Sequence, residues 1–568
     1  MGILAHGQET GASLSLRLRR IAQAVIGALC SMGVAGVGHA FEIDTDSDVK
    51  LRWDNTFKYS AATRLGNASN AILNGGPGGP PPSGIVLDDG DRNFKKGLIS
   101  NRVDWFSELD ATYRNTGFRI SGAAWYDSIY RRGNANTSAA TVNSTSVPVG
   151  QFPAATADLM GRKAEILDAF VFVKNDPASE TPFSVRAGKH TVLYGESLFF
   201  GANGIAYAQA PMDLVKLLQV PGSQFKEIIR PVGQVSTQVQ LNSNVSVGGY
   251  YQYQWEKNRI PPSGSYLSDV DFVGEGNESV LGMRHVNDYA AKNSGQGGLQ
   301  LRFKPEGGTV EYGVYAAQYN DKGPQIMLSP SFIPNSSNTY RMVYAEGVKT
   351  FGASFSTVFG PTNVSGEASL RTNAPIVSAP QVDVGMVGNG SNNPLYAIGR
   401  TAHLQISSIT LFGKSPIWDG AVFLNELAWN RRLSMQQNPL AIDPNVTRDA
   451  TALRLILEPQ YFQVISGVDL SVPIGLGYNP SGRSSSVFKF NGGVEHGGDF
   501  SIGVTADYQK QFKAGINYVR FYGKKDAFLT PWSPGAGVNA TYPGPYMQTG
   551  AQSLGDRDFI SFSIQATF

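Results

Sequence analysis

Apolar and polar residues alternate along unusually long stretches of this chain. In residues 49–65, VKLRWDNTFKYSAATRL, the odd positions carry mostly apolar and aromatic side chains such as Trp53 and Phe57, and the even positions carry mostly polar or charged ones such as Arg52 and Lys58. Because successive side chains of a strand point to opposite faces, the alternation predicts a strand with one apolar and one polar face. Strands of soluble domains usually have about five or six residues, so a strand of this length suits another class of protein.

The same pattern recurs to the end of the chain. Residues 101–132 predict a hairpin around the turn RNTG at 114–117. Further arms are predicted at residues 183–195, 235–241, 245–256, 297–319, 345–371, 403–413, 421–430, 454–463, 500–523 and 559–568. Short turns such as KPEGG and FGPTN join some arms, whereas long segments rich in Gly, Pro, Ser and Asn join others. Short connections at one end and long ones at the other are typical of an outer-membrane barrel.

We therefore predict an all-β fold, in which residues 41–568 form a single closed antiparallel transmembrane β-barrel of about 14–18 strands with long external loops. A strand that crosses the apolar layer at a tilt needs about 9–11 residues. The sheet must close, because no strand edge can stay unpaired in lipid. The apolar face would contact lipid, and the polar face would line the lumen.

The first 40 residues have the features of a cleaved signal peptide. Arginines at 17, 19 and 20 precede an uncharged apolar run at 21–37, and Gly38-His39-Ala40 follows. We expect cleavage after Ala40. Cys30, the only cysteine, would leave with this peptide, so the mature chain could form no disulfide.

The motifs indicate neither catalysis nor nucleic-acid binding. Without residues 1–40 the chain carries 44 basic and 44 acidic residues, which is no nucleic-acid signature. Its remaining histidines follow no metal-ligand spacing such as His-Glu-x-x-His, and no Gly-x-Ser-x-Gly elbow occurs. We therefore predict that the protein is not an enzyme and has no catalytic residue, cofactor or metal. Barrel enzymes whose Ser/His or Asp/His pairs meet only in space stay an alternative.

The last ten residues predict how the barrel closes. Phe562, Ile564, Ala566 and Phe568 alternate with polar residues. A closing strand that ends on an aromatic residue is typical of the signal read by the barrel assembly machinery, which we expect as a partner beside the outer-membrane lipid. The alternative is an ordinary edge strand.

Residues 195–234 lack the alternation of the predicted arms. Pro211 precedes a run at 213–218 that predicts a short helix, and Pro221-Gly222 would end it. The segment is apolar for an exposed loop, which favours a constriction or plug folded into the lumen; an external loop over the mouth is the alternative. In the first case its charges would face the lumen. The candidate binding residues are Glu196, Asp213, Lys216 and Arg230, with Lys226 and Glu227 beside them.

Several stretches also resemble a known family. They include WDNTFKYSAATRL (53–65), KKGLISNRVDWFSELDATY (95–113), VRAGKHTVLYGESLFFGANGI (185–205), PMDLVKLLQVPGSQFKEIIRPV (211–232) and GVDLSVPIGLGYNPSGRSS (467–485). In this order they resemble a large proteobacterial family of unknown function whose members are predicted to be outer-membrane barrels. Genes of that family often lie near resistance-nodulation-division type exporters and near catabolic genes for hydrophobic compounds.

The pattern and the resemblance together lead to one functional hypothesis. We expect a protein of the Gram-negative outer membrane that acts as a channel or transport component for small molecules. The resemblance alone implies that these molecules are hydrophobic. A periplasmic or inner-membrane protein is a candidate transport partner, which the sequence does not identify. The alternative is a non-transporting surface protein, either adhesin-like or a barrel enzyme.

Overall fold

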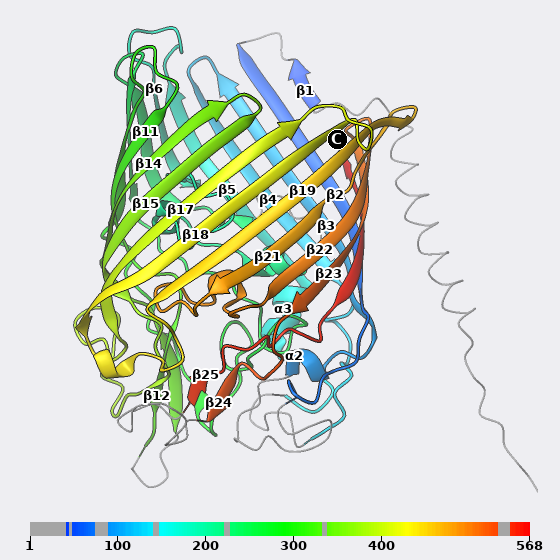
Figure 1. Ribbon diagram of the computed structural model, residues 1–568, viewed down its shortest axis with the longest axis vertical. Helices are drawn as coiled ribbons and strands as arrows, with labels where there is room; N and C mark the ends of the chain where they lie inside the picture. Colours follow the sequence, from blue (N-terminus) through cyan, green and yellow to red (C-terminus); the bar gives the residue numbers. More distant parts are fainter. Residues whose placement is uncertain are drawn as a thin grey trace, which may run out of the picture.

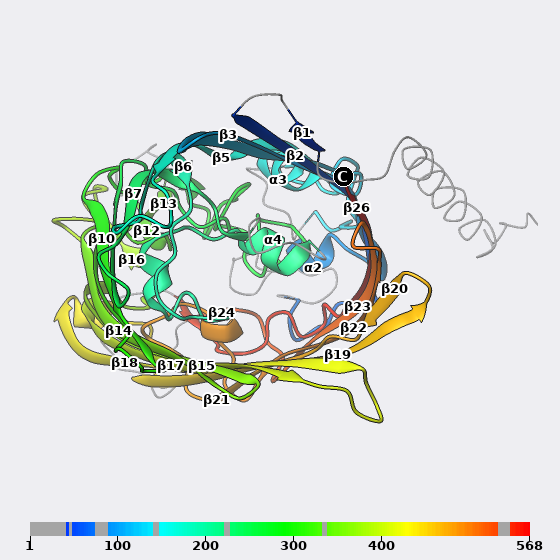
Figure 2. The ribbon, with the colours of Figure 1, turned by 90° about the horizontal axis from the view of Figure 1, so that it is seen from above.

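A large antiparallel β-barrel makes up most of the computed structural model (Figures 1 and 2). The structure describes residues 41–44, 48–73, 89–139, 147–220, 228–331, 338–531 and 546–568. The predicted signal peptide, residues 1–40, lies outside the described residues.

The barrel wall is one continuous sheet of 20 strands. These strands are β1 (Phe41–Asp44), β2 (Val49–Arg64), β3 (Gly97–Tyr113), β4 (Thr116–Asp127), β5 (Arg162–Lys174), β6 (Phe183–His190), β7 (Val232–Gln240), β8 (Val245–Gln252), β10 (Gln296–Phe303), β11 (Glu311–Tyr319), β14 (Val348–Phe359), β15 (Thr362–Pro375), β17 (Ile398–Phe412), β18 (Gly420–Gln437), β19 (Asp449–Ile465), β20 (Val468–Ser471), β21 (Ile474–Ser481), β22 (Gly498–Tyr508), β23 (Phe512–Tyr522) and β26 (Phe559–Thr567). β20 and β21 are two parts of one wall strand, and β1 is a short addition beside the start of β2. The wall therefore has 18 strands.

The ring closes between the first and the last long strands. β2 pairs antiparallel with β26 from Thr56 opposite Thr567 to Arg64 opposite Phe559, and its other edge pairs with β3. Every other neighbouring pair of wall strands is also antiparallel. The predicted all-β closed barrel of about 14–18 strands is confirmed.

Two wall strands have no counterpart among the predicted arms. β5 contains a register shift between its pairings with Ile120 and Gly122, and this bulge moves the alternation out of phase. The strand formed by β20 and β21 is interrupted at Pro473, which has no N–H to donate to a ladder. Period-2 reading misses β5 because the phase of its alternation changes halfway. In β20 and β21 the alternation from Val468 to Tyr478 and the register with β19 both continue through Pro473, so the local pattern is sufficient to predict this strand.

The two faces of the wall differ in polarity. Outward positions carry large apolar side chains, among them Leu299, which is 64% exposed, and Phe351, which is 55% exposed. Inward positions carry polar and charged side chains such as Arg102, Glu426 and Asn430, which are buried. An apolar outer face around a polar interior is the arrangement of a membrane barrel.

The connections at the two ends of the barrel differ in length. At the upper end in Figure 1, the strands are joined by short turns such as 114–115, 360–361 and 509–511. Connections of ten to more than thirty residues lie at the lower end. The long connections carry the 3-10 helices η2 (Pro439–Ala441) and η3 (Phe490–Gly492), the helices α2 (Asp89–Arg92) and α3 (Ala154–Gly161), a small sheet of β9 (Arg284–His285), β12 (Gln325–Ser329), β13 (Thr339–Val343) and β16 (Gln381–Val382), and a pair of β24 (Leu529–Pro531) and β25 (Tyr546–Gln548).

The long connections pack against one another at that end. Tyr340 and Met342 of β13 are almost completely buried, and Phe272 and Leu328 join them in one apolar cluster. Among the described helices, none is long and apolar enough to span a membrane.

Candidate functional site

Residues 191–231 connect β6 to β7, and we call them the inward segment. They contain η1 (Ile205–Ala208) and α4 (Leu214–Gln219), and α4 lies inside the ring of wall strands in Figure 2. Residues 221–227, and with them Lys226 and Glu227, lie outside the described residues. Hydrogen bonds and ion pairs attach the described part of the segment to the wall, and the residues that form them make up the candidate site.

Glu426 of β18 holds the first part of the inward segment by its backbone. Its carboxylate accepts the N–H groups of Leu198 at 3.1 Å and of Phe200 at 2.8 Å, and it also accepts the N–H of Phe199. The glutamate is fully buried. Hydrogen bonds to a charged acceptor are about twice as strong as neutral ones, so one side chain fixes three successive residues.

Glu367 of β15 holds the next turn of the segment in the same way. Its carboxylate accepts the N–H of Glu196 at 2.6 Å and that of Ile205 at 2.8 Å. A Cβ atom at Gly195 or Gly204 would come within 2.3 or 2.5 Å of a carboxylate oxygen of Glu367. These two glycines therefore allow the backbone to approach the wall closely.

Side chains of the wall also bind the tip of this turn. The side-chain amide oxygen of Asn203 lies 3.0 Å from Nδ1 of His403 on β17. Arg371 of β15 donates to the carbonyl groups of Ala202 at 3.0 Å and Gly204 at 2.9 Å. The inward segment is thus fixed through its backbone as well as through its side chains.

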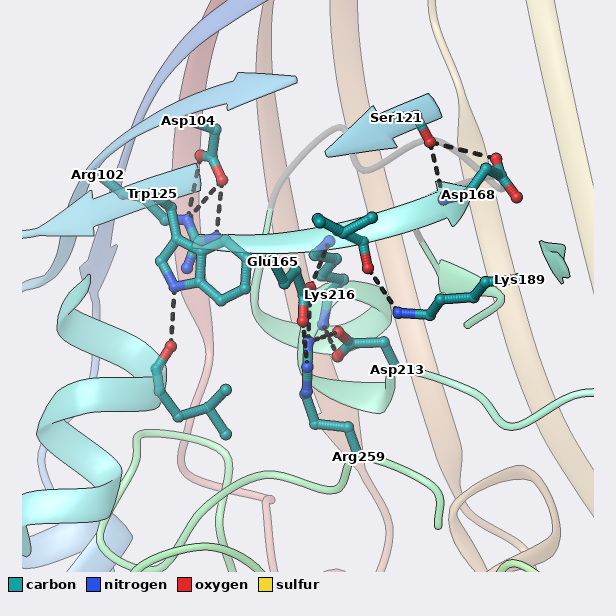
Figure 3. Close-up of polar contacts among 12 residues, drawn as sticks. Arg102, Asp104, Ser121, Trp125, Glu165, Asp168, Lys189, Asp213, Lys216 and Arg259 are labelled. Carbon is teal, nitrogen blue, oxygen red and sulfur yellow. Dashed lines mark hydrogen bonds and ion pairs between the residues drawn. The ribbon is translucent and has the colours of Figure 1, made fainter. Parts of the chain in front are cut away.

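A second set of contacts fixes α4 inside the ring of wall strands (Figure 2), and Figure 3 shows the residues that make these contacts. Asp213 caps the helix by accepting the N–H of Lys216 at 3.0 Å, and it binds Arg259 at 2.6 Å. Arg259 also forms two hydrogen bonds with Glu165 of β5, at 3.0 and 2.5 Å. The ammonium group of Lys216 lies 3.5 Å from the same Glu165. Two carboxylates and two cations from three parts of the chain therefore meet in one buried cluster, which we call the central ion cluster.

Trp125 of β4 forms the apolar side of the central ion cluster. Three cations surround its ring: Arg102 at 4.8 Å, Lys216 at 5.2 Å and Arg259 at 6.0 Å from the ring centre. Its indole N–H donates to the carbonyl of Leu159 at 2.8 Å. Cations over an aromatic face are attracted by its quadrupole, so the tryptophan helps to hold positive charge in the lumen.

A cavity of about 100 Å³ lies beside this cluster. Arg230 lines it, donates to the carbonyl of Lys257 at 2.8 Å, and lies 3.6 Å from Glu256. Burial lowers the pKa of Arg230. Lys163, at an inward position of β5, contributes a further cation. The cavity is also lined by the carboxylates of Glu256, Glu275 and Asp288 and by the cations of Lys257 and Arg259. The apolar side chains of the lining are Leu159, Ile260, Val273, Met342 and Tyr344.

Glu196 lies apart from the central ion cluster. It forms an ion pair at 2.9 Å with Arg302 of β10. Burial raises the pKa of the Glu196 carboxyl, with Arg302 opposing the shift. The structure therefore brings Asp213 and Lys216 into one cluster, puts Arg230 at the adjoining cavity, and places Glu196 against the wall.

Sequence reasoning missed the wall residues that hold the segment. Glu367 and Glu426 lie in VSGEASLR and FLNELAWN, both within predicted arms. A carboxylate at an inward position in the middle of a strand is the signal that could have found them. Glu165 was hidden by the phase shift in β5, and Arg259 lies 46 residues from Asp213 in the sequence.

The described residues contain no group of three or more His, Cys, Asp and Glu side chains that could hold a metal ion. The buried His403 lies between Asn203 and Thr401, at 3.0 and 2.8 Å. The arrangement can hold and orient charges along the lumen, and its cavity offers both apolar and ionic contacts.

A family model described as "Protein of unknown function (DUF1302)" matches residues 21–568. No curated protein matches the chain.

Solved structures with a similar outline are outer-membrane proteins with very low sequence identity. OccAB1 of Acinetobacter baumannii is 10% identical with a TM-score of 0.39, and the match covers 93% of this chain and 99% of that one. A BenF-like porin from Pseudomonas fluorescens Pf-5 is 9% identical with a TM-score of 0.39, and the match covers 91% and 98%. The outer-membrane protein opdK of Pseudomonas aeruginosa is 9% identical with a TM-score of 0.37 and the same coverage. At such low scores, the fold assignment rests on the strand pairing of the chain itself.

Proposed function

This chain belongs to the DUF1302 family of proteins of unknown function, and we propose that it is an outer-membrane channel whose lumen is narrowed by the inward segment. The observation that carries the proposal is the closed wall of 18 strands with an apolar outer face and a charged inner face. Barrels of this width enclose a lumen that side chains of the wall alone do not fill.

The inward segment is the element that would set what passes. Its irregular backbone is tolerated because it lies away from lipid, and its backbone N–H groups have acceptors in Glu367 and Glu426. The central ion cluster places charges on α4 inside the ring. A solute in the lumen would therefore meet fixed charges of both signs.

For the cargo we propose small hydrophobic molecules that carry a polar or charged group. The apolar lining of the cavity supports the hydrophobic part, with side chains such as Leu159, Ile260 and Met342. The cations of Lys163 and Arg230 in the same cavity support the polar part. Ligand sites commonly combine an apolar lining with a few polar groups that set orientation.

Deleting residues 201–222 tests the role of the segment. The wall contains none of these residues, so the barrel should assemble and show heat-modifiable migration. Single-channel conductance in planar bilayers should rise severalfold, because wide barrels without an obstruction pass polar solutes freely. A control deletion of residues 386–392, in the connection between β16 and β17, should leave conductance unchanged. Normal conductance of the 201–222 deletion in an assembled barrel would contradict the proposal.

Cargo is tested separately in proteoliposomes. Swelling rates are compared for neutral sugars and for small aromatic or aliphatic molecules with and without a charged group. Faster entry of the charged hydrophobic molecules, and its loss in Lys163→Gln with Arg230→Gln, supports the proposed cargo. Equal entry of sugars would contradict it.

The outer-membrane location and the partners form the remaining part of the proposal. The closing strand β26 would be recognised by the barrel assembly machinery, and a periplasmic or inner-membrane partner would act in transport. A catalytic role is not proposed. Membrane fractionation of the full chain, followed by crosslinking in intact cells, tests location and partners together.

A further inference from the structure

Arginines gather on the outer surface at the end of the barrel that carries the long connections. The first basic cluster lies where β4 ends and β5 begins, and consists of Arg131, Arg132 and Arg162. The second basic cluster lies at the same end of β17, β18 and β19, and consists of Arg400, Arg431 and Arg448.

The register of the strands places Arg162 of the first basic cluster at the end of the lipid-facing surface, and Arg131 shares the carboxylate of Asp158 with it. Arg162 lies opposite Tyr126, so both side chains are on the same face, and Tyr126 lies opposite Val103. Tyr126 is 51% exposed and Val103 is 49% exposed, which identifies this face as the outer one. Arg162 therefore lies at the end of a row of outward-facing side chains that includes Val103 and Tyr126.

The second basic cluster has the same relation to the lipid-facing surface. Arg400 is exposed and alternates in β17 with buried residues, in phase with the outward Leu404 and Ile406. Arg431 lies opposite Ala402, on the same face. The side chain of Arg448 reaches across to the backbone carbonyl of Arg432, at 3.1 Å.

Carboxylates are too few to neutralise these arginines. Asp158 lies 3.4 Å from Arg131 and 3.9 Å from Arg162, and Asp449 lies 3.2 Å from Arg431. Within the described part of the chain, no carboxylate lies within 4.0 Å of a side-chain nitrogen of Arg132, Arg400 or Arg448. Each basic cluster therefore keeps uncompensated positive charge.

The opposite end of the barrel provides an internal comparison. Among the exposed cations near the short turns, Arg52, Arg114, Lys414 and Lys513 have acidic partners, namely Asp54, Asp48, Asp419 and Asp507. In the described part of the chain, four exposed lysines at the same end have no carboxylate within 4.0 Å, namely Lys50, Lys174, Lys304 and Lys510. The difference between the two ends therefore concerns the arginines of the basic clusters, whose side chains bind phosphate in a bidentate manner.

We infer that the two basic clusters bind the phosphate groups of an anionic glycolipid in the outer leaflet. The inference rests on the proposed location in the outer membrane, where long connections face outward. A guanidinium group binds phosphate in a bidentate manner, and the outward column below each cluster offers an apolar surface for the acyl chains. The lipid would surround the barrel with fixed headgroups at two places on its rim.

Binding of lipid A is measured on the full chain in nanodiscs of neutral phospholipid. The variants are Arg131→Gln/Arg132→Gln/Arg162→Gln and Arg400→Gln/Arg431→Gln/Arg448→Gln. Each basic residue near an anionic membrane surface contributes roughly a fivefold factor in affinity. The affinity of the substituted cluster for lipid A should therefore fall by about 100-fold in each triple variant. The control Arg52→Gln/Arg114→Gln/Lys414→Gln, at the other end, should bind like the unmodified protein.

Two further probes identify the source of the phosphate. Dephosphorylated lipid A should bind weakly, and inorganic phosphate should compete poorly, because it lacks the acyl chains. Equal binding of dephosphorylated lipid A, or unchanged binding by both triple variants, would overturn the inference. Full competition by inorganic phosphate would show a simple anion site and would also overturn it. The single-channel conductance of the two triple variants is also measured in planar bilayers. Normal conductance together with lost lipid binding would show that lipid binding and channel function are separate properties, so each proposal can fail without the other.

Discussion

The attachment of the inward segment to Glu426 yields a quantitative prediction for Glu426→Ala. The substitution removes the acceptor of three backbone N–H groups, those of Leu198, Phe199 and Phe200. A hydrogen bond to a charged group contributes roughly 1.5–3 kcal/mol where water is excluded. Water can replace part of it in a lumen, so we take about 1 kcal/mol for each N–H, or about 3 kcal/mol in total. Detachment of this part of the segment should therefore become about 100-fold more frequent.

Hydrogen–deuterium exchange on the barrel in detergent measures this detachment directly. Amides of residues 198–200 should exchange about 100-fold faster in Glu426→Ala, whereas amides of the wall strands should be unchanged. Glu426→Gln keeps one acceptor oxygen and should give an intermediate rate. Glu458→Ala is the matched control, because Glu458 lies on the same face of β19 as Arg454, the residue opposite Glu426. Unchanged exchange at 198–200 in an assembled Glu426→Ala barrel would refute the reasoning.

Two further predictions concern the wall and a long connection. Ile516→Arg, at an outward position that is 57% exposed, should lower the free energy of unfolding in vesicles by about 2–4 kcal/mol. The control Asn517→Arg places the same charge on the inward face and should leave this free energy nearly unchanged. Equal effects of the two substitutions would contradict the assignment of the outward and inward faces. Burial raises the pKa of Asp443 to about 6, above its value in an unfolded chain, although its contacts with the N–H groups of Asn445 and Gln548 oppose the shift. The folded state therefore binds this proton more tightly, so the contribution of Asp443 to stability is full below pH 4 and is lost as the pH rises through about 6. The thermal unfolding temperature should fall between pH 4 and pH 7, and Asp443→Asn should make this fall smaller. An identical pH dependence in the variant would contradict the assignment of the fall to Asp443.

Much of the wall could be predicted because alternation is a local property of the sequence. Residues 49–65 predict β2 and both of its faces, and β2 covers Val49–Arg64 in the structure. The same reading failed at β5, where a bulge shifts the phase. Local patterning cannot register such a shift, because the partner strand decides which residue is left unpaired.

The candidate site depended far less on local pattern. The sequence distinguished residues 195–234 as a segment unlike the arms, and it singled out Glu196, Asp213, Lys216 and Arg230 from their charge. It contained no sign that Asp213 and Lys216 meet Glu165 and Arg259 while Glu196 meets Arg302. Pairings of this kind depend on which strands become neighbours around the ring.

By itself, then, the sequence determined the class of the fold, the polarity of each face and the end at which the long connections lie, because these follow from the side-chain period of a strand and from connection lengths. Only the tertiary structure decided how many strands close the ring and which carboxylates hold the inward segment. Closure brings β15 and β18 to the same lumen as a connection that begins after β6. Glu367 and Glu426 bind backbone N–H groups there that are 171 and 226 residues away in the chain, and contacts at such separations exist only once the barrel has closed.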